Sequence, residues 1–176
     1  MKMKHPSHTK TGHSRKAAIT GLVIFLAISF APALFGSQFK PDAWYQGLVK
    51  PALNPPGWVF APVWTVLYAA MAVSAWLVWR QKDRAPVHGA LFLFGIQLVL
   101  NGIWTYLFFG LKNPGVAFVE IVVLWAAIAC TLISFRQKSR TAALILIPYL
   151  AWVSFAAYLN FELWRLNPTA ALGLPY

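Results

Sequence analysis

Acidic residues and cysteine are scarce in this sequence. Of its 176 residues only four are acidic, and 11% are charged, against roughly a quarter in an ordinary soluble domain. The hydrophobic fraction is 59%, and these residues form stretches of about 20, the length that crosses a bilayer as a helix. Such proportions exclude an ordinary soluble domain. The single cysteine, Cys130, excludes an intrachain disulfide.

Five apolar stretches predict an all-α integral membrane protein. None alternates with the period of a barrel strand, so the backbone groups have to pair within each stretch, as they do in a helix. We expect a bundle at 17–165, preceded by a basic disordered arm at 1–16 and followed by a tail at 166–176. The five predicted transmembrane helices are 17–39, 57–79, 87–110, 114–135 and 142–164.

The basic residues predict how this bundle lies in the membrane. Eleven of the fifteen Lys and Arg residues fall before the first stretch, after the second or after the fourth, all on one side. The positive-inside rule therefore places the N-terminus in the cytoplasm and, with five spans, the C-terminus outside. The net charge of +11 then reflects orientation, and no nucleic-acid partner is expected. We expect a multi-pass protein of a bacterial cell membrane, with an outer or organellar membrane left open.

The first stretch allows a second interpretation. A basic start, an apolar run and the Ala-Pro-Ala triplet at 31–33 are similar to a signal peptide with its A-x-A cleavage site. The run is longer than a usual signal-peptide core, which favours a membrane span. His5, His8 and His13 lie in the arm before it. In a segment rich in Lys, Ser, Thr and Gly they do not indicate a metal site, and none is expected elsewhere.

Four of the nine tryptophans lie deep within predicted helices. Aromatic belts at the membrane interfaces account for the others, but an indole N–H inside a span has no water to bond and needs a partner. The rise per residue places polar and aromatic groups together in the outer half of the bundle, under a Pro-rich connection at 36–56 that forms either a lid or an interfacial anchor. These groups are Trp64, Trp104, Asn101 and Glu120. Trp125 and Trp152 are expected to form the floor of this region, near the midplane of the membrane.

Polar residues inside the helices have two interpretations. Gln97, Asn101 and Thr105 recur every four residues and form one stripe, which serves either for hydrogen bonds between helices or for a ligand. The aromatic face at 60–68 is likewise either core or a stacking surface for a flat ring. Glu120 is the one acidic residue deep inside a span. It is either a functional group or a neutral side chain bonded to a neighbouring helix.

One stretch resembles a known family signature. Residues 50–68 read KPALNPPGWVFAPVWTVLY and closely resemble the motif of the TspO/MBR family, the tryptophan-rich sensory proteins related to the mitochondrial translocator protein. The similarity extends to the Trp-Tyr pair at 44–45, to residues 100–104 in the third stretch, and to Pro-Tyr-Leu-Ala-Trp at 148–152. It covers about residues 17–167, and the motif in the second stretch is highly specific.

The resemblance implies a five-helix homodimer that binds porphyrins, such as protoporphyrin IX or haem, beneath the first loop. It also implies sterol and benzodiazepine-type ligands, no obligatory cofactor, and a role as a receptor, transporter or stress-response sensor. Trp64 and Trp152 are similar to tryptophans tied to light-dependent porphyrin breakdown in some members. In the C-terminal sterol motif the tyrosine position holds Phe161, which argues against tight sterol binding. The implied ligand-binding residues are Trp44, Tyr45, Trp64, Tyr68, Asn101, Trp104, Leu107, Trp125 and Trp152.

Three other functions stay open beside a porphyrin receptor. The sequence has no Walker loop, dinucleotide fingerprint or nucleophile elbow, so the one enzymatic activity we consider is photochemical breakdown of a bound porphyrin. A solute transporter would use Glu120 as its coupling residue, and a membrane scaffold would act only through partners. From position and charge alone, Lys40 or Lys50 is expected to pair with a porphyrin propionate.

Overall fold

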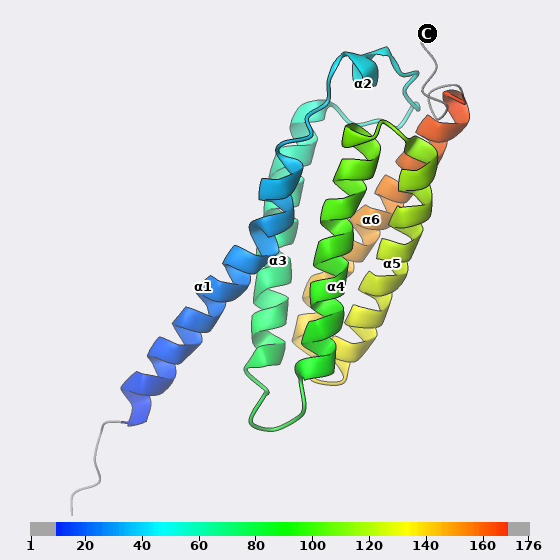
Figure 1. Ribbon diagram of the computed structural model, residues 1–176. Helices are drawn as coiled ribbons and strands as arrows, with labels where there is room; N and C mark the ends of the chain where they lie inside the picture. Colours follow the sequence, from blue (N-terminus) through cyan, green and yellow to red (C-terminus); the bar gives the residue numbers. More distant parts are fainter. Residues whose placement is uncertain (1–9, 169–176) are drawn as a thin grey trace, which may run out of the picture.

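Five long helices and one short one build the described part of the chain. The structure is a computed structural model that describes residues 10–168 (Figure 1). This part contains no strand, and five of its helices are long and apolar enough to cross a membrane. The predicted five-helix membrane bundle is therefore confirmed. The helices are α1 (Lys10–Gly36), α2 (Ala43–Gly47), α3 (Phe60–Trp79), α4 (His88–Thr105), α5 (Pro114–Arg136) and α6 (Arg140–Leu166), with a 3-10 turn at Gly57–Val59 before α3 and a π-helical turn at Tyr106–Gly110 after α4.

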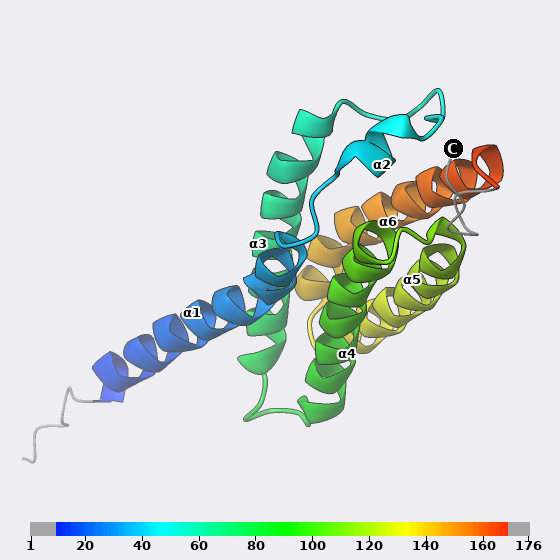
Figure 2. The ribbon, with the colours of Figure 1, turned by 45° about the horizontal axis from the view of Figure 1, so that its top comes forward.

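The bundle has two different ends. Helices α3, α4, α5 and α6 run side by side, whereas α1 crosses obliquely and diverges from the others toward its own start (Figures 1 and 2). Helix α1 packs against α3 and α4. The connection at 37–56, which contains α2, lies over the end where α1 and α4 finish. We call this the loop end, and the opposite end, with the α3–α4 and α5–α6 connections, the basic end.

Helix α1 begins earlier than the sequence indicated. It starts at Lys10, so residues 10–16, expected within a disordered arm, are helical. Extending an existing helix adds one hydrogen bond per residue and avoids the cost of a new nucleus, which explains why a polar segment continues the apolar span. The Ala-Pro-Ala triplet at 31–33 lies inside the same helix. Residues 1–9, with His5 and His8, and residues 169–176 lie outside the described part of the chain.

Polar side chains start the last two long helices. Asn113 precedes α5, and its Oδ1 accepts a hydrogen bond from the backbone N–H of Val116 at 3.0 Å. Pro114 follows at the first helical position, where its fixed φ suits a helix and its missing N–H costs nothing. Ser139 similarly accepts from the backbone N–H of Ala142 at 3.2 Å. These caps set the points at which the short connections on either side of α5 turn.

Small residues bring α3 and α6 close together toward the basic end. Ala72, Ser74 and Ala75 of α3 are fully buried, and the Ser74 hydroxyl donates to the backbone oxygen of Ala142 on α6 at 2.8 Å. Lipid provides no hydrophobic force between helices, so close packing and such hydrogen bonds hold them. Side chains fill this half of the bundle, including Phe135, which is fully buried.

Candidate ligand-binding site

A cavity of about 830 Å³ opens at the loop end of the bundle. It lies among the five long helices α1, α3, α4, α5 and α6 beneath the loop, and its volume falls within the range of about 300–1,000 Å³ typical of small-molecule sites. Its lining residues come from separate segments, so only the folded bundle brings them together. Six of the expected site residues line it: Tyr45 from the loop, Trp64 and Tyr68 from α3, Asn101 and Trp104 from α4, and Trp152 from α6.

A chain of hydrogen bonds joins three helices at the cavity wall. The Tyr68 hydroxyl donates to Asn101 Oδ1 at 2.6 Å, and Asn101 Nδ2 donates to the Tyr149 hydroxyl oxygen at 3.2 Å. Tyr149 is fully buried, and Asn101 is 4% exposed. Asn101 therefore links α3, α4 and α6, and it also lines the cavity.

The other two residues of the polar stripe also face protein. Gln97 is buried, with Nε2 3.7 Å from the Met71 sulfur and with no partner for Oε1 among the described residues. Thr105 lies on the cavity lining close to Gly36, where an added Cβ would be 3.1 Å from the Thr105 methyl. The stripe on α4 thus turns toward α1 and α3.

Aromatic rings form much of the cavity wall. The Trp64 ring stacks on Tyr68 with centroids 5.3 Å apart and meets Tyr149 edge-on at 6.3 Å. Phe60 packs edge-on against Trp152 at 6.0 Å. The Trp152 indole nitrogen is buried and has no hydrogen-bond partner among the described residues. An unused donor therefore lies in a side chain that lines the cavity.

Asn160 holds Trp104 in place, a role that sequence reasoning did not assign. The Trp104 indole N–H donates to Asn160 Oδ1 at 2.9 Å, and Asn160 Nδ2 donates to the backbone oxygen of Pro114 at 2.7 Å. Trp104 also stacks on Phe108 with centroids 5.1 Å apart. An asparagine in an apolar helix, at the depth of an indole that needs an acceptor, is the signal that could have revealed this pair.

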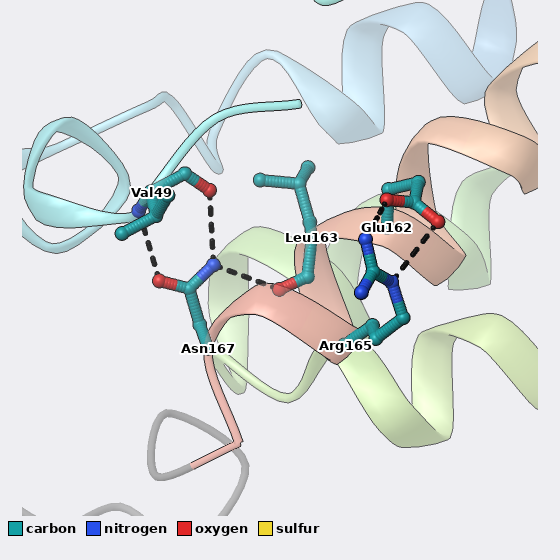
Figure 3. A network of polar contacts seen from close by, with 5 residues as sticks. All are labelled: Val49, Glu162, Leu163, Arg165 and Asn167. Atoms are coloured by element: carbon teal, nitrogen blue, oxygen red, sulfur yellow. Dashed lines mark hydrogen bonds and ion pairs between the residues drawn. The ribbon is translucent and has the colours of Figure 1, made fainter. Parts of the chain in front are cut away.

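Two polar contacts fasten the loop to the bundle. Asn167, just after α6, accepts from the Val49 N–H at 2.9 Å and donates to the Val49 and Leu163 backbone oxygens at 3.0 and 2.8 Å (Figure 3). Asn167 is buried although it belongs to the expected tail. Lys112 Nζ lies 2.7 Å from Asp42 Oδ2, and this hydrogen bond lowers the pKa of Asp42.

Helix α2 packs its aromatic residues on the π-helical turn after α4. Trp44 meets Phe108 edge-on at 5.9 Å, and Tyr45 meets Phe109 in the same way at 5.4 Å. Leu48, just after α2, is buried in the same cluster. The part of the loop around α2 therefore packs against the bundle and covers the cavity on that side.

The cavity lining carries positive charge. Lys40 and Lys50 both line it, and none of the described lining residues is acidic. Lys50 Nζ donates to the backbone oxygens of Tyr45 and Leu48 and lies 4.2 Å from the centre of the Tyr45 ring. Partial burial lowers the pKa of Lys50, and burial raises the pKa of Tyr45. This electrostatic environment favours a ligand with negatively charged groups.

Comparison with known proteins identifies the family. The sequence profile of the TspO/MBR family matches residues 19–165. The chain belongs to the TspO/MBR family. It is 43% identical to the tryptophan-rich protein TspO of Chlorobaculum tepidum, over 85% of this chain and 98% of the relative. It is 41% identical to the tryptophan-rich sensory protein of Cereibacter sphaeroides and 40% identical to the translocator protein of Homo sapiens, each over 81% of this chain and 89% of the relative.

Three of the nine residues implied by the TspO/MBR resemblance lie outside the cavity lining. Trp44 and Leu107 pack in the aromatic cluster behind the wall. Trp125 does not floor the cavity as expected: it is 39% exposed, and its indole N–H donates to the Ser154 hydroxyl at 2.8 Å. Leu124 lines the cavity instead, because successive helical residues point about 100° apart.

Glu120 is buried without a partner in this TspO/MBR bundle. It is 9% exposed, and neither carboxyl oxygen has a hydrogen-bond partner among the described residues. The hydrogen bond to a neighbouring helix, one of the two interpretations of Glu120, is therefore not formed among the described residues. Ile121, the next residue on α5, lines the cavity, whereas Glu120 is not among the lining residues.

Proposed function

We propose that this TspO/MBR protein is a membrane receptor or carrier that binds porphyrins, such as protoporphyrin IX or haem, in the cavity beneath the loop. The observation that carries this proposal is a cavity of about 830 Å³ with aromatic walls and two lysines in its lining. A flat ring gains from stacking and apolar contact, and carboxylates gain from nearby cations. A porphyrin combines a flat ring with two propionates.

The positions of the side chains support a specific pose. The ring lies against the stacked pair Trp64 and Tyr68, and the unused Trp152 indole N–H donates to a polar atom of the ligand. Lys40 is the better partner for a propionate, because Lys50 already donates to two backbone oxygens. In this pose aromatic contact supplies most of the affinity, and the lysine orients the ring.

A titration of two network variants tests the proposal. Protoporphyrin IX is added in the dark to detergent-solubilised protein while tryptophan fluorescence is followed. Asn101→Ala removes a side chain that lines the cavity, whereas Tyr149→Phe breaks the same network at a residue that does not line it. We expect saturable quenching that weakens more in Asn101→Ala than in Tyr149→Phe. Equal affinities in the wild type and Asn101→Ala contradict the proposed site.

Light-dependent breakdown of the porphyrin is a second candidate function. The observation that favours it is that Trp64 and Trp152, the two tryptophans implied by the resemblance, line the same cavity. The test is to illuminate the porphyrin complex in air and to record its absorbance. Loss of the Soret band with growth of a bilin-like band, slowed in Trp152→Phe, supports breakdown. A spectrum that changes equally without protein contradicts it.

Coupled transport is a third candidate, carried by Glu120. A buried acidic side chain with two unpartnered oxygens is costly inside a membrane helix and marks a functional group. In proteoliposomes loaded on one side, the wild type is expected to take up porphyrin faster than Glu120→Gln, which has nearly the same shape. Full uptake by Glu120→Gln removes the support for coupling.

A further inference from the structure

The basic end of the bundle carries cations that have no ion-pair partner. Within residues 15–168 the structure contains two salt bridges, Lys112 with Asp42 and Arg165 with Glu162, and both lie at the loop end. The basic end has one acidic residue, Asp83. Its cations within residues 15–168 are Arg15, Lys16, Arg80, Lys82, Arg84, Arg136, Lys138 and Arg140.

Two tryptophans join α1 to α3 near this end. The Trp76 indole N–H donates to the backbone oxygen of Ala18 at 2.8 Å. The Trp79 ring lies against Gly21, where an added Cβ would come within 2.6 Å of it, and meets Phe25 edge-on at 6.4 Å. The two indoles therefore connect α1 with the last turn of α3.

A cation lies over each of these indoles. The Arg80 guanidinium is 4.9 Å from the centre of the Trp76 ring, and Lys82 Nζ is 4.2 Å from the centre of the Trp79 ring. Both cationic side chains are exposed. Stacking on aromatic rings reduces the freedom of long basic side chains while their charged ends stay accessible. Two cations are thus held on the two indoles that join α1 to α3.

We propose that this junction binds the headgroup of an anionic phospholipid, with Arg80 and Lys82 as the phosphate ligands. Guanidinium and ammonium groups form charge-assisted hydrogen bonds with phosphate oxygens, and tryptophan is the residue typical of the headgroup layer. On the adjoining helix Ile19 and Val23 are more than half exposed, which gives an acyl chain an apolar surface below the headgroup.

The occupant is a lipid because Arg80 and Lys82 directly follow a candidate membrane span that ends at Trp79, and the headgroup layer begins where a span ends. Basic pockets next to transmembrane helices attract anionic lipids through charge, and the attraction falls off within a Debye length. Lys112 and Arg165 at the loop end differ, since both already have carboxylate partners. The junction therefore combines free cations, interfacial aromatic rings and exposed apolar surface.

A competition between two lipids tests this proposal. The full chain in detergent is incubated with equal amounts of phosphatidylglycerol and phosphatidylcholine that carry the same acyl chains, and the retained lipids are counted by native mass spectrometry. The test variant is Arg80→Gln with Lys82→Gln. The matched control, Arg136→Gln with Arg140→Gln, removes the same charge from the same end at the α5–α6 connection. Far-UV circular dichroism confirms the fold of both variants, whose changed side chains are all exposed.

The expected results distinguish a specific lipid site from a general attraction of anionic lipids to the basic end. Each basic residue near an anionic headgroup is worth about fivefold in affinity, so the test variant should bind phosphatidylglycerol about 30-fold more weakly while the control keeps most of its affinity. Equal losses in both variants, or no preference for phosphatidylglycerol in the wild type, overturn the proposal. Displacement of the lipid by millimolar inorganic phosphate also overturns it, because the site would then recognise phosphate without the lipid.

Discussion

The contact between Asn160 and Trp104 gives a quantitative prediction. Asn160 is 1% exposed and accepts the Trp104 indole N–H at 2.9 Å while it donates to the backbone oxygen of Pro114 at 2.7 Å. Leucine at position 160 has a similar size and no polar atoms. Asn160→Leu therefore leaves the indole N–H without its acceptor, in a place where lipid offers none.

Two estimates bound the loss of stability. Hydrogen bonds between membrane helices average about 0.6 kcal/mol, whereas a buried donor left without a partner costs about 1–3 kcal/mol. The Pro114 oxygen also accepts a helical hydrogen bond in the first turn of α5. Losing the Asn160 hydrogen bond to this oxygen therefore costs less free energy than losing the acceptor of the Trp104 indole N–H. The indole contribution therefore dominates, and we expect Asn160→Leu to lower the free energy of unfolding by about 1–2 kcal/mol.

A double-mutant cycle isolates the pair. Trp104→Phe keeps an aromatic ring against Phe108 but has no N–H, so Asn160→Leu should cost much less in that background. The free energy of unfolding is measured for all four proteins by circular dichroism in mixed micelles with increasing dodecyl sulfate. We expect a coupling energy of about 1 kcal/mol. Additive effects, with no coupling, refute the argument that Asn160 positions Trp104.

Two further predictions concern packing and the lid. Gly21→Ala places a methyl group against the Trp79 ring, so the overpacking cost of about 1–3 kcal/mol should exceed the helix-propensity gain of about 0.5–1 kcal/mol. Gly95→Ala meets no atom within 4 Å and should be stabilising in the same unfolding assay. Stabilisation by both substitutions contradicts the packing of Gly21 against Trp79. The lowered pKa of Asp42 means that its ion pair with Lys112 stabilises the lid above the ordinary value of 3.8 and is lost as pH falls below it, so hydrogen exchange of α2 should rise in acid in the wild type and rise less in Lys112→Ala, where Asp42 still caps α2 by accepting the Tyr45 N–H; an identical acid response in both refutes the role of the pair.

The sequence predicted how deep a residue lies along its helix, whereas it did not predict which side of the helix faces the cavity. Counting residues from the helix ends placed Trp64, Trp104 and Asn101 in one half of the bundle, and all three line the cavity. The same counting failed for Trp125, because the number of residues from a helix end gives depth and not direction; the mark of the inward face was Glu120, which is buried one turn before Leu124. In the structure Leu124 faces inward and Trp125 is 39% exposed.

Long-range contacts were the other part that the sequence did not reveal. Asn167 lies in the expected tail, yet it is buried and bonds to Val49, which is more than a hundred residues away. The four deep indoles were expected to have partners, and this holds for Trp104 and Trp125. The Trp152 nitrogen has none among the described residues, so the expectation of a protein partner is not met for this indole.

The most direct test of the proposed porphyrin site compares two tryptophan variants in one dark titration with protoporphyrin IX. Trp64 lines the cavity and Trp125 does not, although both lie deep in their helices. An aromatic stacking contact is worth about 0.5–1.5 kcal/mol, so Trp64→Leu, which removes the ring, should weaken binding roughly two- to tenfold, while Trp125→Leu should bind as the wild type does. Equal affinities in all three proteins, or a weaker affinity in Trp125→Leu alone, would contradict binding in this cavity.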